Sequence, residues 1–411
     1  MNIFSLGRIR FNLIFLIGSF ILFSGCDKEL NEIDESKVLK KLTVQEEALI
    51  NSTNSLSLDI LKAETEINQN KNFFFSPVSV GMALGMIYNG VGQQEKLQIL
   101  QTTGLELLAE NEINKSYNDL LSFLQASNAH MNISYANSLW FSSDININED
   151  FRTKVMAYYD AEIEELNFNK SSSLELINHW GNFKTKGNFE KILDITPPKN
   201  TDIFLVNAFG LNTSWEKNNN YFLTKSDFFT TQGEKLDAQT MNWDGINVSM
   251  NENDDYSFIE FPFEGKSFFF SVIVPQDWST ISELMQSFSI SDFKNIRENS
   301  YGVKANVSLP DIDFTNDKPM KSTLSHIGLE DIFSKSVDLS PSFIETNRQI
   351  SEINQKSVIT LEPDVFSNQR SLSFSNRDLI ALNINKPFLY FVRDKTTKTV
   401  LFAGYYASPT N

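Results

Sequence analysis

The sequence has only one cysteine, Cys26, and three histidines in 411 residues. A single cysteine cannot form an intrachain disulfide. The histidines, His130, His179 and His326, share no ligand-like spacing with Cys26 or with carboxylates, which argues against a metal site. The sequence also lacks a Gly-x-Ser-x-Gly motif and a paired-carboxylate motif for hydrolysis. We therefore expect a protein that is not an enzyme and has no cofactor.

Positive charge is also scarce. The chain has 35 Lys and Arg against 52 Asp and Glu, a formal net charge of −17. Such a surface repels phosphate backbones and anionic headgroups, which argues against nucleic acid and against electrostatic membrane binding. The 35 phenylalanines can fill a large core, and the sequence contains no repeat or internal linker. We expect one domain over residues 43–411.

The N-terminus differs from the rest of the chain. Arg8 and Arg10 precede an apolar run over residues 11–23, which is too short for a membrane-spanning helix and typical of a secretory signal. The run ends on Ser24-Gly25-Cys26, as in a bacterial lipoprotein signal, with Phe23 in place of the usual leucine. In such a signal the cysteine thiol is lipidated and becomes the new N-terminus. An incidental free cysteine is the alternative.

The prediction for this region is a lipoprotein signal peptide over residues 1–25 and a tether over residues 26–42, which is mixed in charge and weakly apolar. The protein would then be extracytoplasmic and anchored to the bacterial envelope or cell surface by lipid on Cys26 only.

Helix signals dominate the first half of the chain. Thr43 with Glu46 forms a capping box that predicts a helix starting near Val44. Ser76-Pro77 predicts a second helix start, with an end near Gly90. Further helices are expected over residues 93–100, 113–125, 149–159 and 174–185.

Strand signals dominate the second half. Short apolar or alternating runs predict strands over residues 203–211, 235–241, 257–261, 267–274, 304–309, 357–361 and 388–393. Helices that lead and strands that follow indicate the α+β class.

A long polar segment separates the strand at 357–361 from an apolar run at 379–384. It begins after Pro363 and Asp364, is rich in Ser and Asn, and has no hydrophobic period. A segment of this length is uncommon in a compact domain unless it is functional or disordered. We therefore look for the function there.

A set of short motifs, in this order and spacing, resembles the serpin family over nearly the whole chain after the signal. The motifs are Asn72 to Ser79 with Ala83, Leu84 and Gly90; Asn137 with Leu139 and Trp140; Ile177 to Trp180; Thr185 to Gly187; Asn207 with Trp215; Phe261 to Phe263; Leu309-Pro310; Leu324 through Gly328 to Phe333; Asn385 to Phe388; and Phe402 to Gly404.

The resemblance implies a serpin fold with three β-sheets, eight or nine helices and an exposed reactive-centre loop, which corresponds to the polar segment. It implies an inhibitor of serine-type endopeptidases. A target peptidase cleaves the loop, which then inserts as a new strand in the largest sheet. The implied partner is an extracellular serine or cysteine peptidase, and the implied state is a monomer.

The resemblance also assigns residues that control opening of that sheet. Ser76, Ser79 and Asn207 match a polar cluster that holds the central strands together, and Gln355 replaces the family histidine there. Trp215 matches the aromatic residue at the top of the sheet. The family pairs a glutamate at the loop base with a lysine after the Leu-Pro motif. Continuous alignment puts Pro363 and Asp311 at those places, so that ion pair is lost.

The hinge of the loop departs further from the family. Inhibitory members carry small residues there, whereas this chain has Glu362, Pro363, Asp364, Val365, Phe366 and Ser367, followed by Asn368 and Gln369. A register that runs unbroken from Lys356 turns Phe366, Asn368 and Arg370 inward. A slip of one residue, with Glu362 in the place of the family glutamate, turns Val365, Ser367, Gln369 and Ser371 inward instead. Both registers remain open.

Counting from both ends of the loop places the cleaved bond near Arg377 and Asp378, and an arginine on its N-terminal side implies a trypsin-like target. The alternative is that Arg377 is a solvated loop cation. The two functional hypotheses are a peptidase inhibitor and a non-inhibitory serpin used for binding, display or as a decoy substrate. The atypical hinge makes stable trapping the point that separates them.

Overall fold

The structure, a computed structural model, describes residues 41–68, 70–126, 132–216, 221–345, 347–362 and 379–409. The predicted signal peptide, Cys26, nearly all of the tether, hinge residues 363–367 and the predicted cleavage bond at Arg377 and Asp378 lie outside the described residues. Those predictions therefore stay predictions. The described residues all fall within one compact unit.

The N-terminal helices begin where the capping residues predict. Thr43 caps α1 (Val44–Ile67), and its hydroxyl and backbone exchange hydrogen bonds with Glu46. Ser76 caps α2 (Pro77–Tyr88), whose residues are all buried. The other described helices are α3 (Gln93–Thr103), α4 (Glu110–Ala126), α5 (Glu149–Tyr159), α6 (Ser172–Lys184), α7 (Ile281–Ser287), α8 (Ile290–Glu298) and α9 (Lys321–Leu324).

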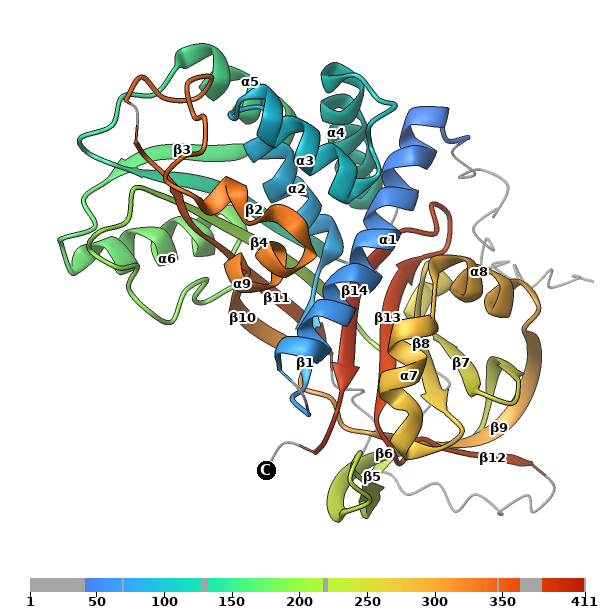
Figure 1. The fold of residues 1–411 in the computed structure, drawn as a ribbon. Coiled ribbons are helices and arrows are strands. Elements are labelled where there is room, and N and C mark those ends of the chain that lie inside the picture. The colour runs from blue at the N-terminus through green and yellow to red at the C-terminus, as the bar shows by residue number, and fades with distance from the viewer. Residues whose placement is uncertain are drawn as a thin grey trace, which may run out of the picture. The chain divides into compact units, whose positions relative to one another are not determined.

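A five-stranded sheet runs in the order β10-β11-β4-β2-β3. Its strands are β10 (Thr315–Pro319), β11 (Ile350–Leu361), β4 (Ile203–Thr213), β2 (Asn132–Ser142) and β3 (Ala161–Leu166). β11 and β4 are parallel, whereas β10 and β2 pair antiparallel with them. Figure 1 shows β11 and β4 in the middle of this sheet.

A nine-stranded sheet runs in the order β1-β14-β13-β8-β7-β6-β9-β12, with β5 also paired to β6. Its strands are β1 (Phe73–Phe75), β5 (Tyr221–Phe229), β6 (Lys235–Glu252), β7 (Tyr256–Pro262), β8 (Phe268–Pro275), β9 (Tyr301–Pro310), β12 (Ile380–Asn383), β13 (Phe388–Asp394) and β14 (Val400–Tyr406).

The two smaller sheets that the resemblance implies are continuous here through one long strand. The first part of β6 pairs with β5, and its last residues pair with β7. Between these parts the register with β9 shifts between Trp243 and Ile246, which is where a bulge bends a strand. The described strands therefore form two hydrogen-bonded sheets rather than three.

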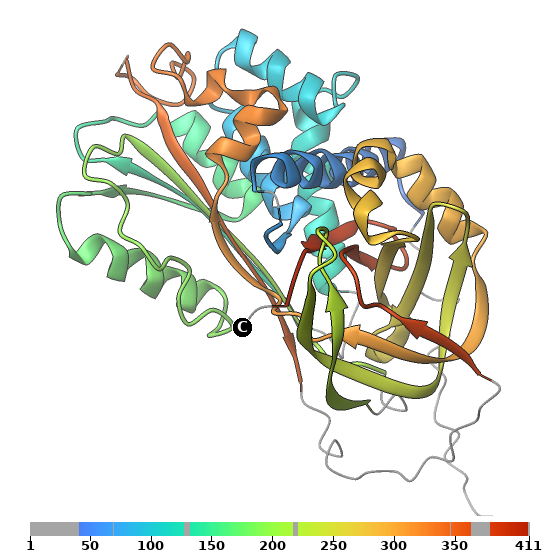
Figure 2. The same ribbon diagram turned by 60° about the horizontal axis from the view of Figure 1, so that its bottom comes forward.

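The two faces of the five-stranded sheet contact different layers. One face joins the main core with α1 and α2, through residues such as Leu205, Phe209 and Ile353. The other face carries a separate apolar cluster with α6, which includes Trp140, Phe204 and Val206. Figure 2 shows the sheet nearly edge-on, with the green helix α6 on one side and the blue helices on the other. We call these the inner and the outer face.

The expected order of helices first and strands second holds only in part. β2 and β3 lie in the first half of the chain, and α7 and α8 lie in the second. β2 was missed because buried Asn137 and Ser138 interrupt its apolar pattern, and β3 because half of its six residues are Glu. The side chains of Asn137 and Ser138 are both fully buried, so they signal a special site rather than a loop.

Candidate functional site

The site is the seam between the parallel strands β4 and β11. Register partners run from Ile203 with Ile350 to Thr213 with Leu361. The last rung is a hydrogen bond of 2.7 Å from Glu362 N to Thr213 O. Glu362, the first predicted hinge residue, therefore lies at one end of the seam, which we call the upper end. The chain is next described at β12, which pairs parallel with β9.

The predicted polar cluster lies in the middle of the seam. Gln355 and Asn207 are register partners, and both are fully buried. Gln355 Nε2 donates to Ser76 O at 2.9 Å, and Ser76 Oγ accepts from Ser79 N at 3.3 Å. The structure thus brings these four residues together, where the N-terminus of α2 meets the inner face of the sheet.

Asn137 completes this cluster, although it was predicted only as part of a family motif, without a role at the seam. Asn207 Nδ2 donates to Asn137 Oδ1, and Asn137 Nδ2 donates to Tyr159 O, both at 2.8 Å. This chain of amides links β4 to β2 and to the end of α5. The signal available in the sequence was a polar residue inside one of the motifs that carry the family resemblance, next to Leu139 and Trp140.

Several buried polar atoms of the seam have no hydrogen-bond partner within the part of the chain that the structure describes. They are Ser79 Oγ, Asn207 Oδ1, Gln355 Oε1 and Ser357 Oγ. Gln355 and Ser357 are neighbours on the inner face of β11, and Asn207 is level with Gln355 on β4. A buried polar atom without a partner costs about 1–3 kcal/mol. The centre of the closed seam is therefore incompletely satisfied.

Trp215 lies just beyond the upper end of β4, where the resemblance places an aromatic residue. It forms a bridge with Phe263, and the two rings stack with centroids 4.9 Å apart. Its ring also meets Trp243 edge-on at 5.5 Å. Ser214, between the seam and Trp215, donates to Glu264 at 2.5 Å. The end of β4 is therefore held by contacts with the nine-stranded sheet.

Asp311 stands where the resemblance implies a lysine. Its backbone N–H donates to Gln239 O at 2.8 Å. Burial raises the pKa of the Asp311 carboxyl, and the nearby carboxylate of Asp313 raises it further. This position therefore carries an acidic side chain, which cannot supply the positive partner of the family ion pair.

On the outer face, polar contacts join the segment between α6 and β4 to β10 and β11. Asp317 of β10 accepts from Asp194 N at 3.0 Å and from Asn354 Nδ2 at 2.6 Å. Lys356 Nζ lies 3.8 Å from Asp194 Oδ2. Burial raises the pKa of the Asp317 carboxyl. Two acidic side chains therefore lie near the one lysine on the outer face of β11.

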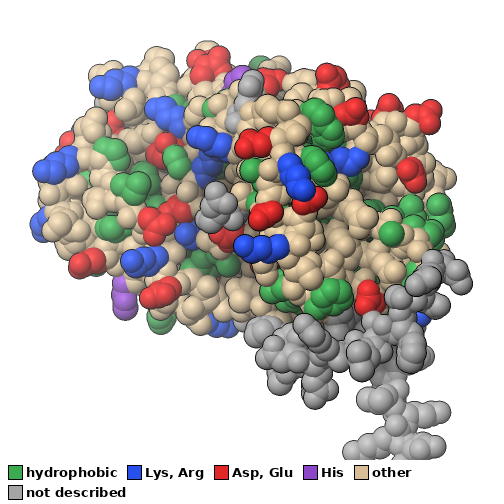
Figure 3. All heavy atoms as spheres, turned by 90° about the horizontal axis from the view of Figure 1, so that it is seen from below, with side chains coloured by type: hydrophobic (Ala, Val, Ile, Leu, Met, Phe, Trp, Pro, Cys, Tyr) green, Lys and Arg blue, Asp and Glu red, His purple; other side chains and the backbone are tan. Residues whose placement is uncertain are grey.

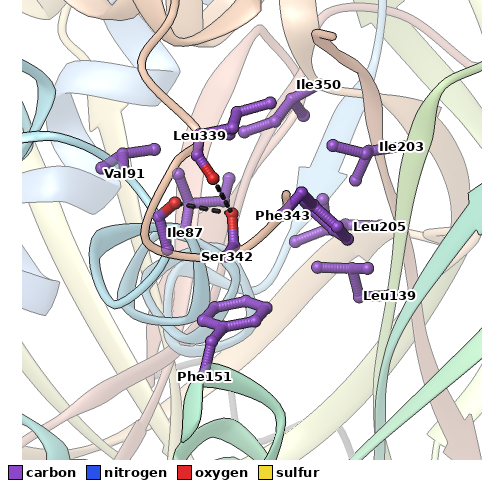
Figure 4. A pocket seen from close by; sticks show the side chains of 11 residues that line it. Ile87, Val91, Leu139, Phe151, Ile203, Leu205, Leu339, Ser342, Phe343 and Ile350 are labelled. Atoms are coloured by element: carbon purple, nitrogen blue, oxygen red, sulfur yellow. Dashed lines mark hydrogen bonds between the residues drawn. The ribbon is translucent and has the colours of Figure 1, made fainter. Parts of the chain in front are cut away.

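The opposite end of the seam encloses a small apolar cavity, shown in Figure 4. Its volume is about 10 Å³, and Ile203, Leu205, Ile350, Phe151 and Phe343 are among the residues that line it. Ser342, also in its wall, donates to Gly90 O at 2.6 Å. A cavity this small holds one water at most, so it is not a ligand pocket.

The described ranges carry no arrangement typical of a metal site or of a membrane-spanning helix. No group of three or more His, Cys, Asp or Glu side chains is arranged to hold a metal there. None of the described helices is both long and apolar enough to cross a membrane. On the face seen in Figure 3, basic side chains lie among acidic ones and form no continuous basic area.

Comparison with known proteins places these features in a family. The family model "Serpin (serine protease inhibitor)" matches residues 51–409. Among curated proteins, the chain is 25% identical to Serpin B8 of Homo sapiens over 88% of this chain and 99% of that protein. It is 25% identical to the leukocyte elastase inhibitor of Xenopus laevis, over 88% and 100% respectively. It is 24% identical to Iripin-1 of Ixodes ricinus, over 81% and 88%.

Solved structures agree on the fold. Native protease nexin-1 crystallised with heparin matches with a TM-score of 0.76 and 20% identity, over 89% of this chain and 100% of that one. Uncleaved ovalbumin matches with a TM-score of 0.76 and 22% identity, over 88% and 100%. Because the family model spans most of the chain and the fold is that of these structures, the protein belongs to the serpin family.

Proposed function

We propose that this protein is an extracytoplasmic inhibitor of serine-type endopeptidases that presents residues 362–378 as its reactive-centre loop. The observation that carries the proposal is the seam. β11 ends at Leu361 and runs parallel to β4 for its whole length. A chain that reverses after Glu362 and enters between the two strands would be antiparallel to both. One parallel ladder would then become two antiparallel ladders, which are slightly more stable per residue.

The proposed target is a trypsin-like peptidase that cleaves after Arg377. Its serine Oγ attacks the Arg377 carbonyl carbon, forms an ester, and releases the α-amino group of Asp378. If the loop then inserts, the ester and the attached peptidase move to the far end of the seam before water can hydrolyse the ester. Each inserted backbone hydrogen bond adds about 1 kcal/mol. A cysteine peptidase could be trapped in the same way through a thioester.

Incubation with a panel of trypsin-like, subtilisin-like and papain-like peptidases tests trapping. We expect a covalent complex with a trypsin-like member that survives denaturing electrophoresis. Arg377→Glu should abolish that complex, because an acidic side chain does not fit a pocket that binds arginine. A peptidase whose catalytic serine is blocked is the control for non-covalent association. Cleavage by the whole panel without such a band would contradict the proposal.

The second candidate function is that of a non-inhibitory serpin used for binding, display or as a decoy substrate. The hinge favours it, because residues 362–369 contain no Gly or Ala and Pro363 cannot donate to a strand ladder. Asp311, in place of the family lysine, adds to it. This function predicts that cleavage of the loop leaves the melting temperature nearly unchanged.

We further propose that the protein is anchored to the bacterial envelope or cell surface by lipid on Cys26, after removal of residues 1–25. The support is the arginine-flanked apolar run that ends on the only cysteine. Growth with a labelled fatty acid should label the protein, and Cys26→Ser should abolish the label and move the protein to the soluble fraction. Unchanged membrane retention of Cys26→Ser would contradict the anchor.

A further inference from the structure

We propose that a pocket between α1, α7 and the turn that joins β5 to β6 binds a neutral carbohydrate. The pocket has a volume of about 400 Å³, which is in the range of small-molecule sites. Its described lining comes from the end of α1, Asn70, the β5–β6 turn, Ser279, α7 and Tyr405 of β14. This lining contains no residue of the seam or of residues 362–378, so the proposal is independent of loop insertion and of peptidase trapping.

Three buried residues form what we call the floor of the pocket. Ile281 and Met285 of α7 are each 2% exposed, and Tyr405 is 4% exposed. The Tyr405 hydroxyl has no hydrogen-bond partner within the ranges that the structure describes, and burial raises its pKa to about 12. It is therefore protonated at neutral pH, and a ligand in the pocket can use it both as a donor and as an acceptor.

The rim of the pocket consists of exposed hydroxyl and amide side chains. Ser282 and Gln286 come from α7, Gln232 from the β5–β6 turn, and Asn70 from the segment after α1. Hydroxyls and amides both donate and accept hydrogen bonds. A sugar ring has apolar C–H faces and a surrounding set of hydroxyls. An apolar floor with one hydroxyl, under a rim of hydroxyls and amides, matches that distribution.

The charge of the pocket favours a neutral sugar over an anionic one. Glu66 is the only charged side chain in the described lining. One of its oxygens accepts from Gln286 Nε2 at 2.6 Å, and the other lies 2.7 Å from His326 Nε2. These two bonds lower the pKa of the Glu66 carboxyl, which is therefore ionised at neutral pH. A carboxylate can accept from sugar hydroxyls but repels sulfate and phosphate groups.

Hydrogen bonds between its segments fix the shape of the pocket. Thr231 Oγ1 donates to Asn70 Oδ1 at 2.6 Å, which joins the β5–β6 turn to the segment after α1. The bond from Gln286 to Glu66 joins α7 to α1. Within the turn, Gly233 has a φ of 75°, a conformation that glycine adopts without strain. Because the walls are already held in place, binding a ligand orders few side chains, which favours affinity.

Saturation-transfer NMR on the full chain tests for binding. The probes are glucose, galactose, mannose, N-acetylglucosamine and lactose, with sulfated lactose as the charged match for lactose. We expect at least one neutral sugar to bind with a dissociation constant in the millimolar range or tighter, and sulfated lactose to bind more weakly than lactose. Methyl glycosides of the sugar that binds distinguish its source, because they represent a sugar at the end of a glycan, whereas the unmodified sugar represents a free one.

Two pairs of variants locate the site. Tyr405→Phe removes only the floor hydroxyl, and should weaken binding about three- to tenfold, as expected for one hydrogen bond, without lowering the melting temperature. Tyr406→Phe is the matched control. It makes the same change on the opposite face of β14, where the Tyr406 ring stacks on Phe388 with centroids 5.0 Å apart, and should leave binding unchanged.

The second pair does not touch the core. Ser282→Leu puts an apolar side chain at the exposed rim and should abolish binding, because it removes a hydroxyl and fills the pocket. Glu283→Leu changes the next exposed residue of α7, outside the lining of this pocket, and should leave binding unchanged. Since both positions are exposed, both variants should melt with the wild type.

Three results would overturn the proposal. No binding of any neutral sugar would remove the site, and a preference for sulfated lactose would contradict the neutral class. Unchanged binding in both Tyr405→Phe and Ser282→Leu would show that the sugar binds elsewhere on the molecule. None of these results bears on trapping, which the peptidase panel tests separately.

Discussion

The two sheets differ in whether their buried polar side chains have hydrogen-bond partners. In the nine-stranded sheet, Glu260 of β7 accepts from Arg393 Nε at 2.9 Å and from Ser271 Oγ at 2.7 Å, so three adjacent strands share one satisfied network. The seam of the five-stranded sheet instead leaves Asn207 Oδ1 and Gln355 Oε1 without a described partner. The Glu260 network is complete among the described residues. The seam keeps two buried acceptor atoms available to the strand that the proposed loop insertion would add.

Breaking the complete network should have the largest effect on stability. Arg393→Ala leaves Glu260 buried without its cation, and we expect the free energy of unfolding to fall by about 3–5 kcal/mol. Urea denaturation at neutral pH measures this. Lys235→Ala, which removes an exposed partner of Asp227, is the control and should change little. A small loss for Arg393→Ala would mean that this network is not what distinguishes the two sheets.

Within the five-stranded sheet, Asn137 has hydrogen-bond partners for both of its amide atoms, whereas Gln355 has a partner for its amide nitrogen only. Substituting each residue compares the two cases. Asn137→Leu removes the partner of Asn207 Nδ2 and of Tyr159 O, and should cost about 2–3 kcal/mol. Gln355→Leu loses one bond to Ser76 O but also removes an unpartnered acceptor, so it should cost about 1 kcal/mol or less. The same denaturation experiment compares them. Equal costs would show that Gln355 is better satisfied than the seam geometry indicates.

Substitution of Asp317, on the outer face of the seam, should have the smallest effect on the free energy of unfolding. This effect should depend on pH. Because burial raises the pKa of Asp317, the folded chain takes up a proton there at higher pH than the unfolded chain does. This group therefore lowers stability as the pH rises through the raised pKa. Asp317→Asn should remove that decline. The decline in the free energy of unfolding is less than about 1 kcal/mol, because the site is partly solvated. Stability measured from acid to neutral pH checks this.

The contradicting result for Asp317→Asn is a larger decline in stability with rising pH than in the wild type. That would mean that the carboxylate stabilises the folded state through its bonds to Asp194 and Asn354 more than burial destabilises it. Glu352→Gln is a matched control. Burial also raises the pKa of the Glu352 carboxyl, but this side chain lies next to α9 and not beside Asp194 and Asn354.

Local signals in the sequence were enough for many elements and for part of the site. The capping box at Thr43 and the Ser76-Pro77 start gave α1 and α2, and apolar runs gave β4 and β8. The motifs placed Gln355, Asn207, Ser76 and Ser79 in one cluster, as the structure has them. The continuity of two implied sheets through β6 was not foreseen, because a bulge between Trp243 and Ile246 leaves no clear local pattern.

Strands that contain buried polar residues were harder to predict from the sequence. β2 escaped prediction because Asn137 and Ser138 look like loop residues until the strands and helices around them are placed. The polar contacts among Asp194, Asp317 and Lys356 join three segments that are far apart in sequence. No local sequence pattern marks these residues as neighbours. The lack of partners for Gln355 Oε1 and Asn207 Oδ1 is likewise a property of the assembled seam.

The most direct test of the account is the melting temperature of the wild-type protein before and after a single cut at Arg377. If the seam accepts the freed segment, its unpartnered atoms gain donors and the melting temperature rises by about 10 °C or more. A melting temperature that stays the same or falls after a confirmed single cut would contradict the claim that this sheet is built to receive another strand.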